Sequence, residues 1–468
     1  MRKTKIVCTI GPASEDDTTI EKLIKAGMNC ARLNLSHGTV ESHMALVKKL
    51  KAIRERLSVP LSIMLDNKGP EIRIAQFENG SVELKKGQKF TLTLKRVIDN
   101  NEHVMVNSPR LMKLVQVGTE VLLDDGNIEL KVVEIKGKDA ICRVVVGGIL
   151  KNNKSINLPG VDMKINYLRD SNPEDLELCV RADVEYFALS FVSSKKDVEC
   201  VRAYLAERGC FPRLISKIEN AQGVKNIDEI LKASDGVMVA RGDLGVEVDY
   251  TLIPAIQKEI IKKSNDMGKI CITATQMLES MTHSQRPTRA EITDVSNAVY
   301  EGSSAVMLSG ETASGEYPVE SVSVMSDIAL EAEKNIDYAE RYNNGGRVID
   351  DFAENLAHAA VGMALNNNAK AIIVATNTGE SAMNLASFVT KPIIFATTPN
   401  SKTYYTLGMC YGVEQVLIPE QKNIQKLFEV SKQQAITRGI IKRGDSVVIL
   451  AGEPGSSVGT NQIKVEIV

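Results

Sequence analysis

The sequence contains no tryptophan, and aromatic residues make up only 4% of its 468 residues. Proteins that bind single-stranded nucleic acid stack bases on aromatic rings, so this scarcity argues against such a function. The net charge of -2 gives no case for a nucleic-acid or membrane-surface partner. No apolar run approaches membrane-spanning length, and the first residues enter a predicted strand without a signal-peptide core. We therefore expect a cytoplasmic protein.

The eight cysteines form no Cys-X-X-Cys pair, the spacing typical of zinc sites and redox motifs. Several cysteines fall inside predicted strands or helices, as small buried hydrophobic residues do. We therefore expect reduced thiols rather than disulfides or bound zinc.

Apolar strands alternate with helical segments along most of the chain, as in proteins built from repeated strand–helix units. Eight such strands occur in the first two thirds of the sequence, and six of them end in polar or charged residues. This arrangement predicts a (β/α)8 TIM barrel with its functional residues at the strand ends. The expected strands are residues 5–11, 30–36, 61–66, 186–192, 213–219, 236–242, 269–275 and 304–309.

The barrel pattern is interrupted after its third strand. Residues 74–159 contain short alternating stretches separated by Gly, Asn and Asp turns, which is typical of an all-β module. After the eighth strand, a helix and five further strands predict a separate open α/β domain. The expected domains are residues 1–70 and 160–343 for the barrel, 71–159 for the inserted module, and 344–468 for the last domain.

Two neighbouring strands end in charges that would share one site. Lys217 and Glu219 are two residues apart, so their side chains point to the same face of the strand. The next strand ends in Arg241-Gly-Asp243, where glycine lets backbone amides approach a ligand. Two carboxylates beside an ammonium suit a divalent metal and an anionic substrate together. For either segment alone, a buried ion pair that supports the fold is the alternative.

Other strand ends add polar groups. The guanidinium of Arg32 suits either a phosphoryl group or an internal salt bridge to Asp66 or Glu71. Asn34, Ser36 and Asp66 are hard oxygen ligands that suit a cation, although capping and turn hydrogen bonds are their commoner use. The many cations beside the candidate metal ligands favour phosphoryl transfer over glycoside hydrolysis, which needs two facing carboxylates.

In the last domain, residues 374–382 lead from a strand into a helix through hydroxyl side chains and a glycine. These groups and the helix-start amides could hold a phosphate, or could simply cap the helix. The residues concerned are Thr376, Asn377, Thr378, Gly379 and Ser381.

Taken together, these segments resemble the pyruvate kinase family over nearly the whole chain, in particular bacterial members without an extra C-terminal extension. Agreement of so many motifs in the same order is not a matter of chance. The motifs are KTKIVCTIGP (3–12), RLNLSHG (32–38), LDNKGPEIR (65–73), ISKIEN (215–220), MVARGDLG (238–245), TATQMLESM (273–281), RPTRAE (286–291) and MLSGET (307–312).

The resemblance implies an α/β fold: a TIM barrel, an inserted small β-barrel domain that acts as a lid, and a C-terminal open α/β domain, assembled as a homotetramer. It implies phosphoryl transfer from phosphoenolpyruvate to ADP, giving pyruvate and ATP as the final step of glycolysis. The implied cofactors are Mg²⁺ (or Mn²⁺) and K⁺. A phosphorylated small molecule could act as an effector through the C-terminal domain.

The resemblance also implies roles for individual residues. Lys217 would stabilise the transferring phosphoryl group and the enolate, and Arg32 would bind the phosphoryl group. Protonation of the enolate would come through water near Thr275, with Ser309. The implied binding sets are Glu219 and Asp243 for Mg²⁺; Gly242, Asp243 and Thr275 for the substrate carboxylate; Asn34, Ser36, Asp66 and Asn67 for K⁺; and Asn34, His37, Arg73 and Lys154 for the nucleotide.

Some positions depart from the usual family residues, and none of them removes a catalytic group. Asn67 replaces a threonine, which should matter little if the K⁺ ligand there is the main-chain carbonyl. Leu35 replaces a phenylalanine, and Ser193 and Ser314 stand where basic residues are common. Glu71 is present, and glutamate at this position accompanies K⁺ dependence in the family, so activity without K⁺ should be poor.

The effector region departs further. Glu380 occupies a phosphate-loop position that is often basic, and residues 452–459 lack the Trp and Arg of many members activated by fructose-1,6-bisphosphate. A carboxylate repels a bisphosphate. We therefore expect altered or absent activation by this bisphosphate, with a sugar monophosphate or AMP as alternatives.

Two other hypotheses stay open on the sequence. A barrel lyase or mutase acting on phosphoenolpyruvate or a related keto acid would share the metal carboxylates but would need neither Arg73, Lys154 nor a lid. An assay without ADP separates it from a kinase. A non-catalytic scaffold or sensor would bind its ligand in the last domain and would not need the charged strand ends.

Overall fold

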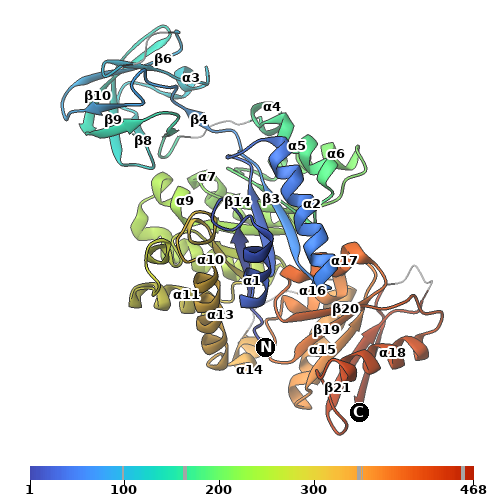
Figure 1. Ribbon diagram of the computed structural model, residues 1–468. Coiled ribbons are helices and arrows are strands. Elements are labelled where there is room, and N and C mark those ends of the chain that lie inside the picture. The colour runs from blue at the N-terminus through green and yellow to red at the C-terminus, as the bar shows by residue number, and fades with distance from the viewer. Residues whose placement is uncertain (97–99, 162–165, 345–348, 350, 455–458) are drawn as a thin grey trace.

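Eight parallel strands close into a barrel in the order β1-β17-β16-β15-β14-β13-β3-β2 (Figure 1). The (β/α)8 prediction is therefore confirmed. Seven of the expected strands end one to three residues earlier than predicted, because the chain leaves the sheet where the polar residues begin. The strands are β1 (Lys5–Thr9), β2 (Cys30–Asn34), β3 (Ser62–Asp66), β13 (Tyr186–Leu189), β14 (Arg213–Ile218), β15 (Gly236–Ala240), β16 (Ile270–Ala274) and β17 (Ala305–Leu308).

The structure is a computed structural model, and it describes residues 1–96, 100–161, 166–344, 349, 351–454 and 459–468. In this part of the chain, no helix is long and apolar enough to cross a membrane.

Helices surround the barrel and bury their apolar faces against its outer surface. Their ends follow from local sequence: Thr288 and Glu291 form a reciprocal capping box that starts α11, and Gly302 ends it in the left-handed conformation. The longer helices of this ring are α1 (Asp17–Ala26), α2 (Val40–Leu57), α5 (Pro173–Ala182), α6 (Lys195–Ala206), α8 (Ile227–Ala233), α10 (Ile253–Asp266), α11 (Arg289–Glu301) and α13 (Pro318–Lys334).

The module inserted after β3 forms a seven-stranded sheet, β4-β12-β8-β9-β10-β6-β7, and a two-stranded sheet, β11-β5. A bridge between Ile74 and Val106 joins the two edges of the larger sheet, so the module curls around its own apolar core. The elements are β4 (Ile72–Arg73), β5 (Ser81–Leu84), β6 (Lys89–Thr93), β7 (His103–Met105), α3 (Leu111–Leu114), β8 (Glu120–Leu123), β9 (Ile128–Lys136), β10 (Asp139–Val146), β11 (Gly148–Lys151) and β12 (Ser155–Asn157).

The last domain is an open sheet in the order β20-β19-β18-β21-β22, parallel except for β22. The predicted open α/β domain is therefore confirmed. Its strands are β18 (Ala371–Ala375), β19 (Ile393–Thr398), β20 (Val413–Leu417), β21 (Ser446–Ala451) and β22 (Gln462–Ile467), and its helices are α15 (Phe352–Asn366), α16 (Glu380–Ala386), α17 (Ser401–Thr406) and α18 (Ile424–Thr437).

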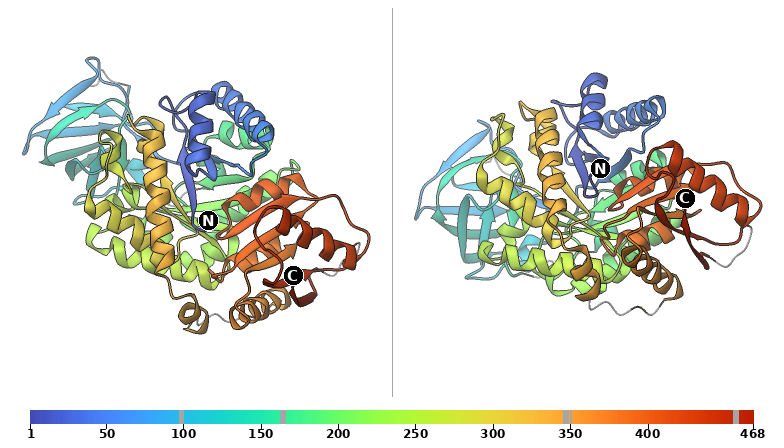
Figure 2. Two further views of the ribbon diagram at one scale, coloured as in Figure 1. Left: turned by 60° about the horizontal axis from the view of Figure 1, so that its bottom comes forward. Right: turned by 90° about the horizontal axis from the view of Figure 1, so that it is seen from below.

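The last domain packs against the amino-terminal end of the barrel, opposite the inserted module (Figure 2). Side chains from inside the barrel and from the last domain share one apolar cluster. Hydrogen bonds cross the contact, among them those from Tyr186 Oη to the carbonyl of Thr406 (2.6 Å), from Ser62 Oγ to that of Tyr405 (2.6 Å), and from Lys5 Nζ to that of Val413 (2.8 Å). The other end of the barrel, where the strands finish, stays available for a site.

Candidate active site

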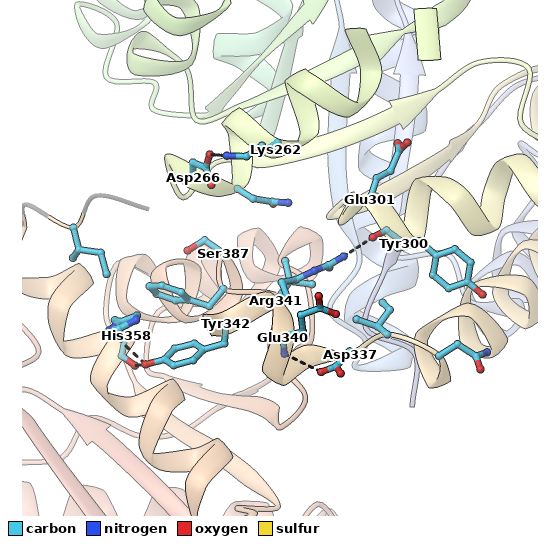
Figure 3. Close-up of a pocket in the computed structure, with 16 residues that line it drawn as sticks. Lys262, Asp266, Tyr300, Glu301, Asp337, Glu340, Arg341, Tyr342, His358 and Ser387 are labelled. Carbon is cyan, nitrogen blue, oxygen red and sulfur yellow. Dashed lines mark hydrogen bonds and ion pairs between the residues drawn. The ribbon is translucent and has the colours of Figure 1, made fainter. Parts of the chain in front are cut away.

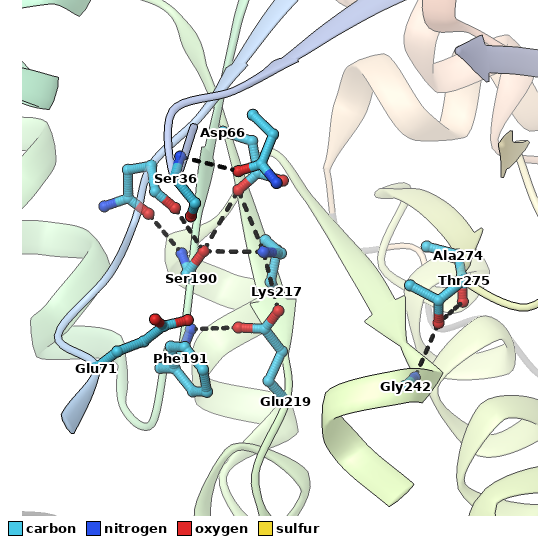
Figure 4. Close-up of polar contacts among 12 residues, drawn as sticks. Ser36, Asp66, Glu71, Ser190, Phe191, Lys217, Glu219, Gly242, Ala274 and Thr275 are labelled. Carbon is cyan, nitrogen blue, oxygen red and sulfur yellow. Dashed lines mark hydrogen bonds and ion pairs between the residues drawn. The ribbon is translucent and has the colours of Figure 1, made fainter. Parts of the chain in front are cut away.

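The carboxyl ends of the barrel strands bring together several of the polar residues singled out in the sequence, and Figure 4 shows part of this group. Arg32 and Asn34 lie on β2, Asp66 ends β3, and Lys217 lies on β14. Asp243 lies in the first turn of α9 (Arg241–Glu247), directly after β15. In a TIM barrel this end of the strands carries the active site, so the fold alone points here.

Lys217 is the centre of this group. Its Nζ lies 2.9 Å from Oε1 of Glu219, 3.2 Å from Oδ1 of Asp66 and 2.9 Å from Oγ of Ser190 (Figure 4). Lys217 and Glu219 thus lie on one face, as their spacing predicts, while Ile218 packs into the outer apolar core. Burial strengthens the attraction between this ammonium and the two carboxylates beside it.

Arg32 points into the same group. Its Nε lies 2.7 Å from Oδ2 of Asp66, and its Nη1 donates a 2.8 Å hydrogen bond to Oγ1 of Thr9. Of the two salt-bridge partners considered from the sequence, Asp66 is the one observed; Glu71 instead pairs with Arg73 at 2.5 Å. Asp66 therefore holds both cations of the centre.

Burial and charge set opposite protonation tendencies on the carboxylates. Burial alone would raise the pKa of Asp66, but the charges of Lys217 and Arg32 outweigh it and lower that pKa. Burial would likewise lower the pKa of Lys217, but Asp66 and Glu219 outweigh it and raise that pKa. In Glu219, burial dominates over the pull of Lys217 and, with repulsion from Asp243, raises the pKa to about 8. Asp66 thus favours its anionic form, and a further positive charge beside Glu219 would lower the pKa of that carboxyl.

A second polar turn lies beside this group, where β15 and β16 end (Figure 4). Oγ1 of Thr275 accepts a 2.8 Å hydrogen bond from the N–H of Gly242 and donates a 2.6 Å bond to the carbonyl of Ala274. Thr275 and Gln276 both have positive φ angles, 68° and 53°, which non-glycine residues rarely adopt. Such strain is concentrated at functional sites, where the surrounding structure over-determines the backbone.

The oxygen ligands expected for a monovalent cation also come together. Asn34 and Asp66 are direct partners in the β2–β3 pairing, and the side chain of Asn34 accepts a 3.1 Å bond from the N–H of Ser36. The carbonyl of Asn67 accepts a 2.7 Å bond from Oγ of Ser190. Four oxygen-bearing residues thus surround the junction of β2 and β3.

The residues expected at a nucleotide are spread between barrel and module. Arg73 donates a 3.0 Å bond to the carbonyl of Asn153, and Lys154 lies 2.6 Å from Asp124, so both cations are engaged inside the module. His37 is exposed at the barrel side. A cavity of about 110 Å³ lies between the inserted module and the barrel, and Glu71 and Phe191 are among the residues that line it.

Comparison with known proteins decides the family. A model of the pyruvate kinase barrel domain matches residues 1–322, and a model of the pyruvate kinase alpha/beta domain matches residues 354–466. The chain belongs to the pyruvate kinase family. Pyruvate kinases convert phosphoenolpyruvate and ADP into pyruvate and ATP, so the chain is a phosphotransferase of glycolysis.

Individual pyruvate kinases are similar along the full length. The chain is 41% identical to a pyruvate kinase of Staphylococcus epidermidis and 42% identical to one of Staphylococcus aureus, covering 100% of this chain and 81% of each relative. The crystal structure of a pyruvate kinase from Cryptosporidium parvum superposes with a TM-score of 0.93 at 37% identity, covering 100% of this chain and 96% of that one.

In this pyruvate kinase, Ser309 follows the last barrel strand and begins α12 (Gly310–Ala313). Its N–H donates a 2.7 Å bond to Oε2 of Glu311. Glu311 is fully buried and also accepts a 3.1 Å bond from the N–H of Leu278; burial raises its pKa. Glu311 thus fixes the backbone at Ser309 and ties it to the segment that follows β16.

The predicted phosphate loop of the last domain lines a cavity of about 270 Å³. Its wall includes Thr376, Asn377, Thr378 and Ser381. The N–H of Gly379 donates a 3.0 Å hydrogen bond to Oγ1 of Thr376. The described residues that line the cavity include two carboxylates, Glu420 and Glu453, and no Lys or Arg. Residues 455–458 of the late loop 452–459 lie outside the described residues.

A cavity of about 570 Å³ lies elsewhere, between barrel helices and the last domain (Figure 3). The rings of Tyr342 and His358 stack in its wall with centroids 4.7 Å apart. None of the predicted catalytic or metal-binding residues lines it. This cavity therefore belongs to the contact between the two domains and not to the catalytic centre.

Sequence reasoning missed several residues of the site. Ser190 follows the apolar strand β13, so its position at a strand end was a usable signal. Thr9 was assigned to the interior of a longer strand, and Tyr167 lies in the short helix α4 (Tyr167–Asp170), where no strand pattern points to a site. Only the three-dimensional structure brings Thr9 to Arg32, Ser190 to Lys217, and Tyr167 to Ser190.

Proposed function

We propose that this pyruvate kinase performs phosphoryl transfer at the strand-end centre around Lys217. The observation that supports it most is the Lys217 ammonium, buried between Asp66 and Glu219, with Arg32 on the other side of Asp66. Lys217 and Arg32 face the position of the transferring phosphoryl group and neutralise its charge. Lys217 also stabilises the enolate that leaves. In a buried site each of these charges acts more strongly than in water.

Glu219 and Asp243 are the proposed ligands of Mg²⁺ or Mn²⁺. Among the described residues, no three acidic, histidine or cysteine side chains gather closely enough to hold a metal by themselves. Two carboxylates fit Mg²⁺, which usually takes one or two protein carboxylates and completes its shell with substrate oxygens and water. The ion would supply charge neutralisation on the transferring group.

The proposed K⁺ ligands are the oxygens of Asn34, Ser36, Asp66 and Asn67. Amide, hydroxyl, carboxylate and carbonyl oxygens suit such a hard cation. The direct pairing of Asn34 with Asp66 across β2 and β3 supports a shared site.

The substrate carboxylate is proposed to bind at Gly242, Asp243 and Thr275, where α9 begins. The N–H of Gly242, now bonded to Thr275, would turn to the carboxylate, whose charge is favoured at a helix start. Protonation of the enolate is proposed to come through water held near Thr275, with Ser309. Asn34, His37, Arg73 and Lys154 are proposed for the nucleotide.

The last domain is proposed to bind a phosphorylated effector at Thr376, Asn377, Thr378, Gly379 and Ser381. The enzyme is proposed to be a cytoplasmic homotetramer. Exposed apolar side chains such as Val465 and Ile467 on the edge strand β22 support association through this domain.

Pyruvate formation from phosphoenolpyruvate, with and without ADP, tests the centre in buffer with Mg²⁺ and K⁺. We expect turnover that requires ADP and is lost in Lys217→Met. The matched control is Lys5→Met, which also removes a buried ammonium but at the opposite end of the barrel. Turnover without ADP would favour a lyase or mutase, and an active Lys217→Met enzyme would contradict the role of Lys217.

A further inference from the structure

One turn of the chain contacts both of the proposed catalytic charges. This turn, Ser190-Phe191, follows β13. Oγ of Ser190 accepts a 2.9 Å hydrogen bond from Nζ of Lys217, and the N–H of Phe191 donates a 2.7 Å bond to Oε2 of Glu219 (Figure 4). Movement of this turn would therefore move the ammonium and the carboxylate together.

The turn is in a conformation that needs support. Phe191 has a φ of 57°, in the left-handed region that side chains rarely adopt. On one side the turn packs tightly against Gly69, since a Cβ at Gly69 would lie 2.7 Å from Cβ of Ser190. Packing can stop the turn from moving toward Gly69, but it cannot hold the peptide groups of Ser190 in one orientation.

Two buried side chains supply that orientation. The side-chain oxygen of Asn67 accepts a 2.8 Å bond from the N–H of Ser190, and the Tyr167 hydroxyl donates a 2.7 Å bond to the carbonyl of Ser190. The amide nitrogen of Asn67 in turn donates a 3.3 Å bond to the Tyr167 hydroxyl. Ser190 is thus held at both of its backbone polar groups by two residues that also hold each other.

We propose that Asn67 and Tyr167 are positioning residues for catalysis, which act by clamping the Ser190-Phe191 turn and thereby aligning Lys217 and Glu219. The proposal rests on the proposed catalytic and metal-binding roles of Lys217 and Glu219. Neither Asn67 nor Tyr167 contacts those two side chains directly. The proposal also gives the side chain of Asn67 a positioning role, separate from the proposed role of its carbonyl oxygen as a K⁺ ligand.

The size of the effect follows from the chemistry of buried hydrogen bonds. Asn67, Tyr167 and Ser190 are each only 2% exposed, so water cannot replace a lost partner. Removing the Tyr167 hydroxyl removes the donor to the Ser190 carbonyl and the acceptor of the Asn67 amide. The turn is then expected to shift so that these two buried groups find other hydrogen-bond partners. A displacement of about 1 Å at a catalytic group costs roughly 100-fold in rate.

Tyr167→Phe is the first test, because it removes one oxygen and little else. The matched control is Tyr186→Phe: Tyr186 is also fully buried and also donates to a backbone carbonyl, but at the contact with the last domain. We expect kcat to fall by about 10- to 100-fold in Tyr167→Phe, with the KM for ADP unchanged, and to stay within about twofold of wild type in Tyr186→Phe.

A second readout does not depend on turnover. Binding of Mn²⁺ alone, followed by electron paramagnetic resonance, should weaken about tenfold in Tyr167→Phe, because Glu219 loses its alignment. The melting temperatures of the two Tyr→Phe variants should be similar. A purely structural role predicts equal losses of stability and no specific loss of kcat or Mn²⁺ affinity in Tyr167→Phe, and that result would overturn the proposal.

Asn67→Ala provides an independent variant should Tyr167→Phe fold poorly. It should lower kcat and Mn²⁺ affinity in the same way. Because the two residues act as a unit, the double variant should have about the same kcat and Mn²⁺ affinity as the more impaired single variant. Fully additive losses would contradict a shared clamp. A wild-type enzyme without ADP-dependent turnover would instead contradict the proposed function. Failure of the positioning proposal and failure of the proposed function are therefore distinguishable.

Discussion

Nη2 of Arg241 donates a 2.6 Å hydrogen bond to the carbonyl oxygen of Thr275. Nη1 of the same guanidinium lies 2.7 Å from Oδ1 of Asp294 on α11. Arg241 therefore ties the positive-φ turn at Thr275 to the helix behind it. This turn carries the hydroxyl proposed to receive the substrate carboxylate, so we expect Arg241 to influence substrate binding by positioning that turn.

Arg241→Lys should impair the use of phosphoenolpyruvate. A lysine keeps the charge but cannot bond a carbonyl and a carboxylate with one rigid fork. We expect kcat/KM for phosphoenolpyruvate to fall by about 10- to 100-fold, with the KM for ADP little changed. The control is Arg202→Lys, whose guanidinium also bonds a carbonyl and an aspartate, but at the other end of the barrel. Equal effects of the two substitutions on steady-state kinetics would contradict this assignment.

Potassium dependence should follow from the oxygen ligands around Asn34 and Asp66 and from Glu71. At constant ionic strength and saturating Mg²⁺, activity in Na⁺ or a tetraalkylammonium salt should be about tenfold or more below that in K⁺. The measurement is a titration of initial rate with KCl against a constant background of the tetraalkylammonium salt. Full activity without K⁺ would rule out this dependence.

Fructose-1,6-bisphosphate should activate the enzyme weakly or not at all. The described wall of the last-domain cavity carries Glu420 and Glu453, and Glu380 begins the adjoining helix, so a doubly phosphorylated sugar would be repelled. Phosphoenolpyruvate saturation curves with and without the bisphosphate should coincide, whereas a sugar monophosphate or AMP should shift them if either is the effector. Saturable activation by the bisphosphate, abolished in Thr376→Ala or Ser381→Ala, is the contrary result.

Asp235 should stabilise the barrel in a pH-dependent way. Burial alone would raise the pKa of Asp235, but Arg202 and Arg213 outweigh it and hold that pKa below its ordinary value. A lowered folded-state pKa contributes stability that is present above the unfolded-state pKa of about 4 and is lost as the pH falls below it.

Asp235→Asn should therefore lower the melting temperature at pH 7 by several degrees, as expected for a loss of about 1–3 kcal/mol. The difference from wild type should shrink as the pH falls below about 4. Differential scanning calorimetry from pH 7 to pH 3 measures it. A difference that is constant over this range would show that Asp235 acts by packing alone.

The barrel could be predicted because its determinants are local and repeat along the chain. Each apolar run has strand length, and the alternation of Lys217 and Glu219 fixed their common face before any tertiary contact was known. The choice of Asp66 over Glu71 as the partner of Arg32 could not be predicted, because both are close in sequence and only the β2–β3 register brings Asp66 within 2.7 Å.

The clamp on the Ser190-Phe191 turn was beyond sequence reasoning for a different reason. Tyr167 lies 100 residues after Asn67 and 23 residues before Ser190. The inserted module lies between Asn67 and Tyr167 in the sequence. Nothing periodic marks Tyr167, and a buried tyrosine is most often a core residue. Long-range polar contacts of this kind depend on how the insertion returns to the barrel.

Strand β1 spans the whole depth of the barrel in five residues. At its start, Lys5 donates a hydrogen bond to the carbonyl of Val413 in the last domain; at its end, Thr9 accepts one from Arg32 in the proposed catalytic centre. Four residues of extended chain measure about 13 Å. A single continuous strand of that length, with no loop in between, therefore joins a contact of the last domain to the hydrogen-bond partner of Arg32.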